Sequence, residues 1–179
     1  MAKLLLTGAR APAALELARN LHRHGHQVII VDSLVYPLAR NSKAIDRFYK
    51  IPGPKENIKK FKKKLLLIIQ QEKIDYLIPT CEEIFYISFL KSELEKCCQV
   101  LCPDFDLIIK LHSKIKILDL CADKGVGIPS TQIIEKSNLE KLAEINGVIA
   151  KKEFCRFGTD VLLSPTREML KNIVDKNNG

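Results

Sequence analysis

Short apolar runs alternate with amphipathic stretches along the front of the chain, up to Asp104. The runs are rich in Leu, Ile and Val, which is typical of strands buried on both faces of a parallel sheet. We predict strands over Lys3–Thr7, Gln27–Val31, Arg47–Ile51, Asp75–Ile78 and Gln99–Leu101. We predict helices over Pro12–His24, over a lysine-rich segment ending near Glu72, and over Ile84–Lys96. This alternation predicts an α/β fold with a Rossmann-like parallel sheet covered by helices.

The pattern changes after Asp104, which indicates a second module. Ser113 is a residue type that begins helices, and a helix is predicted to follow it. The other predicted elements are a helix over Leu107–Leu111, a strand over Thr131–Ile134, a helix over Asn138–Glu144, strands over Val148–Lys151 and Asp160–Leu163, and a helix over Thr166–Val174. We therefore divide the chain into a first domain, residues 1–106, and a second part, residues 107–179, that holds linker helices and the start of an α+β lobe.

The composition is typical of a soluble globular chain, with 46% hydrophobic and 28% charged residues. No apolar stretch approaches the roughly 20 residues of a membrane-spanning helix, and the N-terminus lacks the longer apolar core of a secretory signal. The six cysteines have neither the density of a disulfide framework nor the spacing of a zinc site. We therefore expect a cytoplasmic protein with free thiols and no membrane partner.

The net charge of +8 points toward an anionic partner such as nucleic acid, so the distribution of the charge matters. Much of the excess comes from Lys55, Lys59, Lys60, Lys62, Lys63 and Lys64. Apolar residues such as Phe61 and Leu65 interleave with them at helical spacing, which places the lysines on the outer face of an amphipathic helix. The chain has no Trp on which bases could stack. We interpret the charge as a solvated helix face and expect no nucleic-acid partner, and a non-catalytic basic binding module stays as an alternative.

Two adjacent carboxylates, Glu82 and Glu83, follow the apolar run Ile74–Ile78. Open α/β sheets bind ligands outside the carboxyl ends of their strands, so both residues are candidates for substrate contacts. Carboxylates also stabilise the positive end of a following helix, and this structural role stays open.

The turn Gly8–Ala13 (GARAPA) loosely resembles a dinucleotide-binding loop, and Asp32 stands where that motif has a ribose-binding acid. Arg10 replaces the second glycine, which normally lets the backbone approach a pyrophosphate. An NAD(P)- or nucleotide-sugar-binding enzyme is therefore an alternative function. Arg10 is also a candidate for binding an anionic group near the helix start. No metal site is predicted.

The stretch Val148–Leu163 (VIAKKEFCRFGTDVLL) has two strand-like runs around a turn that contains Lys151, Lys152, Arg156 and Gly158. Lysines on a strand can reach nucleotide phosphates, and backbone N–H groups of a glycine-containing turn can close over them. A basic exposed hairpin without a ligand is the alternative.

The order of these motifs resembles the ATP-grasp carboxylate–amine ligases, in the branch similar to the carbamoyl-phosphate synthase large subunit. The matching segments are Thr7–Arg10 with Ala14–Arg19, Ile74–Phe85 (IDYLIPTCEEIF), Leu111–Thr131 (LHSKIKILDLCADKGVGIPST) and Val148–Leu162. The resemblance implies a Rossmann-like pre-ATP-grasp domain followed by the start of the α+β small lobe of an ATP-grasp domain.

The resemblance also implies roles for individual residues. Lys114 and Lys151 match lysines that contact ATP, with Lys152 as a neighbouring candidate for the second. Arg156 and Gly158, together with Phe157, match the loop that folds over the phosphates. This loop is poorer in glycine than in biotin-carboxylase-like relatives.

On the acceptor side, Glu83 and Glu82 match positions that line the substrate, and we add Arg10 as a substrate-binding residue. The implied function is that of an ATP-dependent carboxylate–amine ligase, or a related C–N or C–S ligase, that acts through an acyl phosphate. Its partners would be small-molecule carboxylates and amines, and an assembly of identical chains stays open. The catalytic residues, and the acidic ligands of Mg²⁺, are expected in a large lobe beyond Gly179, so we expect this chain alone to be inactive.

Overall fold

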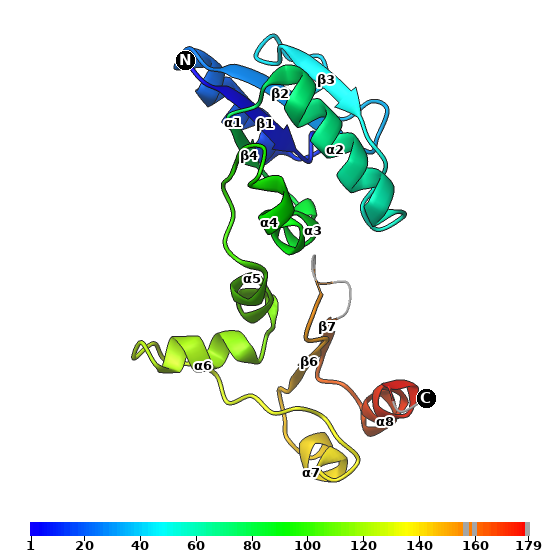
Figure 1. The fold of residues 1–179 in the computed structure, drawn as a ribbon. Coiled ribbons are helices and arrows are strands. Elements are labelled where there is room, and N and C mark those ends of the chain that lie inside the picture. The colour runs from blue at the N-terminus through cyan, green and yellow to red at the C-terminus, as the bar shows by residue number, and fades with distance from the viewer. Residues whose placement is uncertain (156–157, 159–160, 178–179) are drawn as a thin grey trace. The chain divides into compact units, whose positions relative to one another are not determined.

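The computed structural model describes residues 1–155, 158 and 161–177. The chain forms two compact units, residues 1–108 and 109–179 (Figure 1). Among the described residues, none of the helices combines the length and the apolar character that crossing a lipid bilayer requires.

The first unit is built on a five-stranded parallel sheet, which confirms the predicted Rossmann-like fold. Its strands are β1 (Lys3–Thr7), β2 (Gln27–Asp32), β3 (Arg47–Lys50), β4 (Tyr76–Ile78) and β5 (Gln99–Val100). They lie in the order β3-β2-β1-β4-β5, with Leu5 of β1 between Ile29 and Leu77. The strands β2 and β3 are therefore added on one side of β1, and β4 and β5 are added on its other side. The strand order reverses between β1 and β4, and open parallel sheets bind ligands at such a switch point.

Helices cover both faces of this sheet (Figure 1), and its central strands are correspondingly apolar. The helices are α1 (Pro12–Arg23), α2 (Ile58–Glu72), α3 (Glu83–Phe89) and α4 (Lys91–Leu94). Ala14 and Ala18 of α1 pack with Leu6 on one face. Phe61 of α2 and Ile87 of α3 belong to a second apolar cluster, with Leu5 on the other face. The predicted lysine-rich helix is confirmed as α2, and its apolar side is buried in this second cluster.

The single helix predicted over Ile84–Lys96 is wrong in one respect, because the structure divides it into α3 and α4 at Leu90. The backbone of Leu90 leaves helical geometry, with φ −92° and ψ 3°. Both Leu90 and Leu94 are buried in the core beneath the sheet. The apolar spacing across the break is close enough to helical that periodicity alone does not reveal it.

The second unit contains a two-stranded antiparallel hairpin, β6 (Ile149–Lys151) and β7 (Val161–Leu163). Its helices are α6 (Lys116–Ala122), α7 (Leu139–Ala143) and α8 (Arg167–Asn177), and α5 (Phe105–His112) spans the junction of the two units. Leu139, Leu142, Leu170 and Val174 of α7 and α8 form a small core with Ala150 of β6. Side chains alternate along a strand. Ile149 and Lys151, on either side of Ala150, therefore lie on the opposite, open face of the hairpin, and both are exposed.

The strand predicted over Thr131–Ile134 is wrong, because residues 131–134 form no strand. β-branched residues favour extended backbone, but a strand also needs a neighbour with which to share hydrogen bonds. In this segment the Thr131 hydroxyl instead donates to the carbonyl oxygen of Pro129 at 3.0 Å, and Ile133 is largely exposed.

Candidate functional site

Two turns meet at the carboxyl edge of the sheet, between β1 and β4. Gly8 follows β1 with φ +75°, a conformation that side chains rarely adopt. A Cβ atom at Gly8 would lie 2.9 Å from Cβ of Cys81, so the turn after β4 leaves no room for one. The Thr80 hydroxyl donates to the carbonyl oxygen of Thr7 at 2.6 Å and ties the two turns together. Glycine at position 8 is therefore required by close packing as well as by backbone geometry.

Arg10 lies at the centre of the polar groups gathered at this edge. Its Nη1 and Nη2 donate to the two carboxylate oxygens of Glu83 at 2.7 and 3.1 Å, a bidentate arrangement. Nη1 also donates to Asp32 at 3.3 Å, and Nη2 to Glu82 at 3.2 Å. The predicted substrate-binding residues Arg10, Glu82 and Glu83 are thus brought into direct contact, although their roles stay predictions.

The network is buried on one side and open on the other. The side chain of Asp32 is fully buried and that of Glu83 is 7% exposed, whereas Arg10 and Glu82 are 32% and 42% exposed. The hydrogen bonding of Arg10 to the Glu83 carboxylate is the main influence that raises the pKa of Arg10, so the guanidinium stays charged. Three carboxylates and one guanidinium leave a formal charge of −2 on these four side chains. The exposed edge of the network is therefore suited to polar and charged ligands.

Asp32 is fully engaged by this network. One carboxylate oxygen accepts from the backbone N–H and the guanidinium of Arg10, and the other accepts from the N–H of Leu34 at 3.0 Å. In a dinucleotide site the equivalent acid is available to a ribose hydroxyl. Here it holds Arg10 and the start of the next loop.

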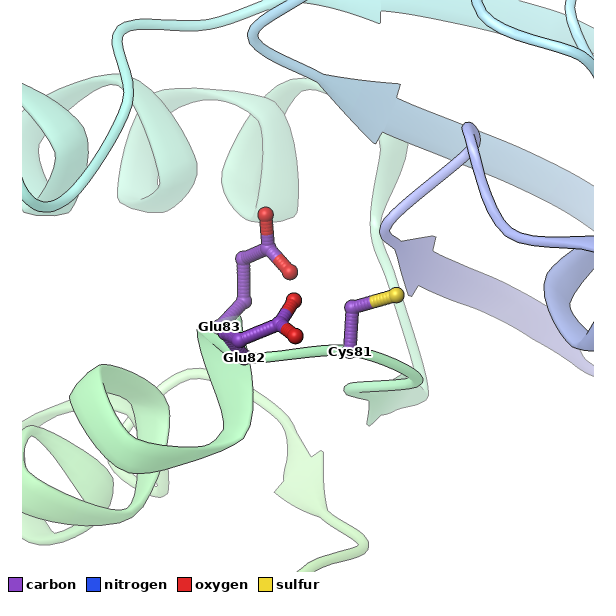
Figure 2. Close-up of side chains that lie close together, drawn as sticks. All are labelled: Cys81, Glu82 and Glu83. Carbon is purple, nitrogen blue, oxygen red and sulfur yellow. The ribbon is translucent and has the colours of Figure 1, made fainter. Parts of the chain in front are cut away.

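Cys81, Glu82 and Glu83 have ligand atoms within 4.8 Å of one another, a spacing at which side chains can hold a metal ion (Figure 2). Two properties of these groups oppose it. Burial is the main cause that raises the pKa of the Cys81 thiol, which keeps it protonated, whereas a metal binds the thiolate. Both oxygens of Glu83 already accept from Arg10. A dication would have to displace the guanidinium, so we assign no metal to this group.

Thr7 contributes a feature that the sequence analysis missed. Its hydroxyl at the end of β1 is the one buried side-chain N or O atom without a hydrogen-bond partner in the part of the chain that the structure describes. A buried polar group of this kind is costly to leave unpaired. The sequence offered a signal, since a hydroxyl residue ends an otherwise apolar strand immediately before the glycine turn.

The predicted nucleotide-binding residues lie in the second unit. Lys151 is exposed on the open face of β6. The ammonium group of Lys114 donates to the carbonyl oxygens of Glu153 at 3.1 Å and Cys155 at 2.9 Å, directly beyond that strand. Gly158 is exposed in a turn with φ +69°. Arg156 and Phe157 lie outside the described residues.

The sequence analysis did not predict the contact between Lys114 and the residues after β6, because its partners are backbone carbonyls. The predicted helix cap at Ser113 is wrong in position, because α6 begins at Lys116 and its N-cap is Ile115. The Ser113 hydroxyl nevertheless accepts from the N–H of Lys116 at 3.0 Å. The same hydroxyl donates to the carboxylate of Glu153, a residue that the sequence analysis did not single out.

Comparison with known proteins gives a consistent result for the fold. No protein-family model and no curated protein sequence matches the chain. Among solved structures, the biotin carboxylase domain of 2-oxoglutarate carboxylase from Hydrogenobacter thermophilus, in complex with MgADP, ADP and bicarbonate, matches 98% of the chain with a TM-score of 0.70 and 18% identity. N5-carboxyaminoimidazole synthetase from Staphylococcus aureus, complexed with ADP, matches 97% with a TM-score of 0.70 and 16% identity. L-amino acid ligase from Bacillus licheniformis matches 100% with a TM-score of 0.71 and 16% identity.

These matches define the class of fold. The chain has the fold of the N-terminal portion of ATP-grasp enzymes, with a five-stranded parallel sheet that corresponds to their pre-ATP-grasp domain. It spans 40%, 44% and 43% of the three matched structures.

Proposed function

We propose that the chain is the nucleotide- and substrate-binding N-terminal portion of an ATP-dependent enzyme that joins a carboxylate to an amine, or to a related nucleophile, through an acyl phosphate. The observation that carries this proposal is the position of Lys114. Its ammonium group contacts the residues directly after the strand that holds Lys151, which gathers two lysines from distant parts of the chain at one hairpin. A pair of cations beside a glycine-containing turn suits the phosphates of ATP.

Each lysine has a defined part in this proposal. Lys151 has no ion pair or side-chain hydrogen bond among the described residues, and it lies on the hairpin face that α7 and α8 leave open. Lys114 uses two of its three ammonium hydrogens on backbone carbonyls, which leaves one for a phosphate oxygen. Gly158, with its left-handed backbone, is the third proposed contact to the phosphates, and the proposal also includes Arg156, which lies outside the described residues.

The Arg10 network is proposed as the substrate side. Its exposed members, Arg10 and Glu82, face solvent at the point where the strand order reverses, and Glu83 fixes the orientation of Arg10. Small-molecule carboxylate and amine substrates suit an edge that carries both a guanidinium and carboxylates. We assign ATP as the cofactor, and no residue described in this chain is assigned as a Mg²⁺ ligand.

The alternative of a dinucleotide-binding enzyme is less well supported, because Asp32 is buried and engaged by Arg10 and Leu34. Thermal-shift measurements that compare ATP with NAD and NADP distinguish the two. We expect ATP to raise the melting temperature and the dinucleotides to leave it unchanged. A larger shift with NAD or NADP would favour the dinucleotide enzyme.

Lys151→Ala tests the ligase proposal directly by titration with ATP. In this proposal two cations, the half-buried Lys114 and the exposed Lys151, supply most of the contacts, so we expect binding in the millimolar range, about −4 kcal/mol. Lys151→Ala removes one cation from the phosphates and should weaken ATP binding about tenfold. Lys171→Ala, which removes an exposed lysine of α8, is the matched control and should bind ATP as the unchanged protein does. Equal affinity in all three proteins would contradict the proposal.

A further inference from the structure

Two short segments of the second unit run alongside one another. They are residues 112–114, which lead into α6, and residues 153–155, which follow β6. The rings of His112 and Phe154 lie with centroids 5.7 Å apart at an interplanar angle of 37°. The Ser113 hydroxyl donates to a carboxylate oxygen of Glu153. We call the contacts between residues 112–114 and residues 153–155 the clasp.

Lys114 supplies the other half of the clasp. Its backbone N–H donates to the carbonyl oxygen of Glu153 at 3.4 Å, and its ammonium group donates to the same oxygen at 3.1 Å. The ammonium group also donates to the carbonyl oxygen of Cys155 at 2.9 Å. The lysine is therefore held at both its backbone and its side chain by the start of the turn that joins β6 to β7.

Ser113 is the residue of the clasp that is held most firmly by its own surroundings. The residue is fully buried, and its hydroxyl oxygen accepts from the backbone N–H groups of Ile115 at 3.4 Å and Lys116 at 3.0 Å. The single hydroxyl hydrogen is donated to Glu153. A hydrogen bond to a charged carboxylate is stronger than one between neutral groups. Although Glu153 is itself exposed, its carboxylate is anchored to the buried Ser113, which precedes α6.

We propose that Glu153, acting through Ser113, is a positioning residue for nucleotide binding. It holds the first residues of the β6–β7 turn against Lys114, and so sets the separation between Lys114 and Lys151, the two proposed phosphate-binding lysines. This inference rests on the proposed function. It adds that residues 153–155 are attached to residues 112–114, just before α6, in the absence of nucleotide, so that the two cations are already arranged for the phosphates.

Pre-arrangement has a measurable consequence. A ligand that finds its binding groups in place does not have to order them, so its affinity is higher. Release of the clasp should lower the affinity for ATP and also make residues 153–155 more mobile when no nucleotide is present. The second effect does not depend on ATP and separates the clasp from the proposed function.

The experiment compares Glu153→Ala and Glu153→Gln with Glu144→Ala, which removes an exposed glutamate of the same unit outside the clasp. The turn is probed by the rate at which iodoacetamide alkylates Cys155, a partly buried thiol, measured by mass spectrometry. Exposed Cys97, in the other unit, is the reference within each sample. Circular dichroism checks that each variant is folded.

In the absence of ATP, we expect Glu153→Ala to raise the Cys155 rate relative to Cys97 at least about fivefold, because one charge-assisted hydrogen bond is lost. Glu153→Gln keeps an oxygen that accepts from Ser113 but loses the charge, so its rate and its ATP affinity should lie between those of Glu153→Ala and those of the unchanged protein. ATP affinity should fall about fivefold in Glu153→Ala and remain unchanged in Glu144→Ala.

Three results would count against these ideas in different ways. An unchanged Cys155 rate in Glu153→Ala would show that the clasp does not hold the turn. A raised rate with unchanged ATP affinity, while Lys151→Ala still weakens ATP binding, would refute the positioning role and leave the proposed function standing. If Lys151→Ala leaves ATP affinity unchanged, the proposed function fails and the positioning role fails with it.

Discussion

Replacement of Arg10 by methionine removes the only cation that contacts Asp32 and Glu83 among the described residues. Both carboxylates are buried, and together they accept three hydrogen bonds from the guanidinium. Removal of one partner from a buried ion pair typically costs about 3–5 kcal/mol, because the remaining charge is left uncompensated. The Arg10 side chain is 32% exposed, so water already screens part of the interaction. We therefore expect a loss of about 2–3 kcal/mol in the free energy of unfolding.

The assay should report on the first unit alone, since the chain has two compact units. Hydrogen exchange of the backbone amides of β1 and β2 does so, because these central strands open only when their unit unfolds. Arg19→Met is the matched control. It breaks the ion pair with Glu16 on the surface of α1, where the side chains are 51% and 66% exposed, and should cost less than about 0.5 kcal/mol.

A second variant separates uncompensated charge from lost packing. Combining Arg10→Met with Glu83→Gln replaces one buried carboxylate by a neutral amide, which should recover part of the lost stability. If Arg10→Met costs no more than Arg19→Met, or if the second substitution makes the loss larger, the account of the site as a buried charge network is wrong.

Two further predictions concern the same unit. Gly8→Ala should destabilise the first unit by about 2–4 kcal/mol, since the added methyl group clashes with the turn after β4 and a non-glycine residue is strained in the left-handed conformation. Gly25→Ala is the control, with φ +79° and nothing within 4 Å of the added atom, and should cost only about 1 kcal/mol. Equal losses of stability in thermal unfolding would contradict the close approach at Gly8. Tyr49→Phe removes the hydroxyl whose hydrogen bond is the largest cause of the lowered pKa of Glu72, below its ordinary 4.5. A carboxyl group whose pKa is lower in the folded than in the unfolded state stabilises the folded state at pH values above the unfolded-state pKa. The loss of unfolding free energy caused by Tyr49→Phe, about 1 kcal/mol, should therefore be fully present at pH 6–7 and shrink as the pH falls below about 4. A loss that is independent of pH in urea unfolding would mean that the hydrogen bond does not favour the ionised carboxylate.

The helix pair α3 and α4 shows where local pattern stops being informative. Helical spacing of apolar residues is a property of neighbours in the chain, and it correctly placed α1 and α2. The break at Leu90 is instead decided by how Leu90 and Leu94 fit beneath the sheet. The segment over residues 131–134 shows the same limit, because β propensity does not supply a strand to pair with.

The amino-acid sequence by itself determined the layered α/β architecture, since runs of Leu, Ile and Val must be covered on both faces and the intervening stretches each have one apolar side. It also indicated the polar positions at the ends of β1 and β4. Only the tertiary structure decided that Arg10 binds Glu83, 73 residues away, and that Lys114 binds the carbonyl of Cys155, 41 residues away. Such pairings depend on strand order and on backbone groups that are the same for almost every residue type, so no local pattern in the sequence encodes them.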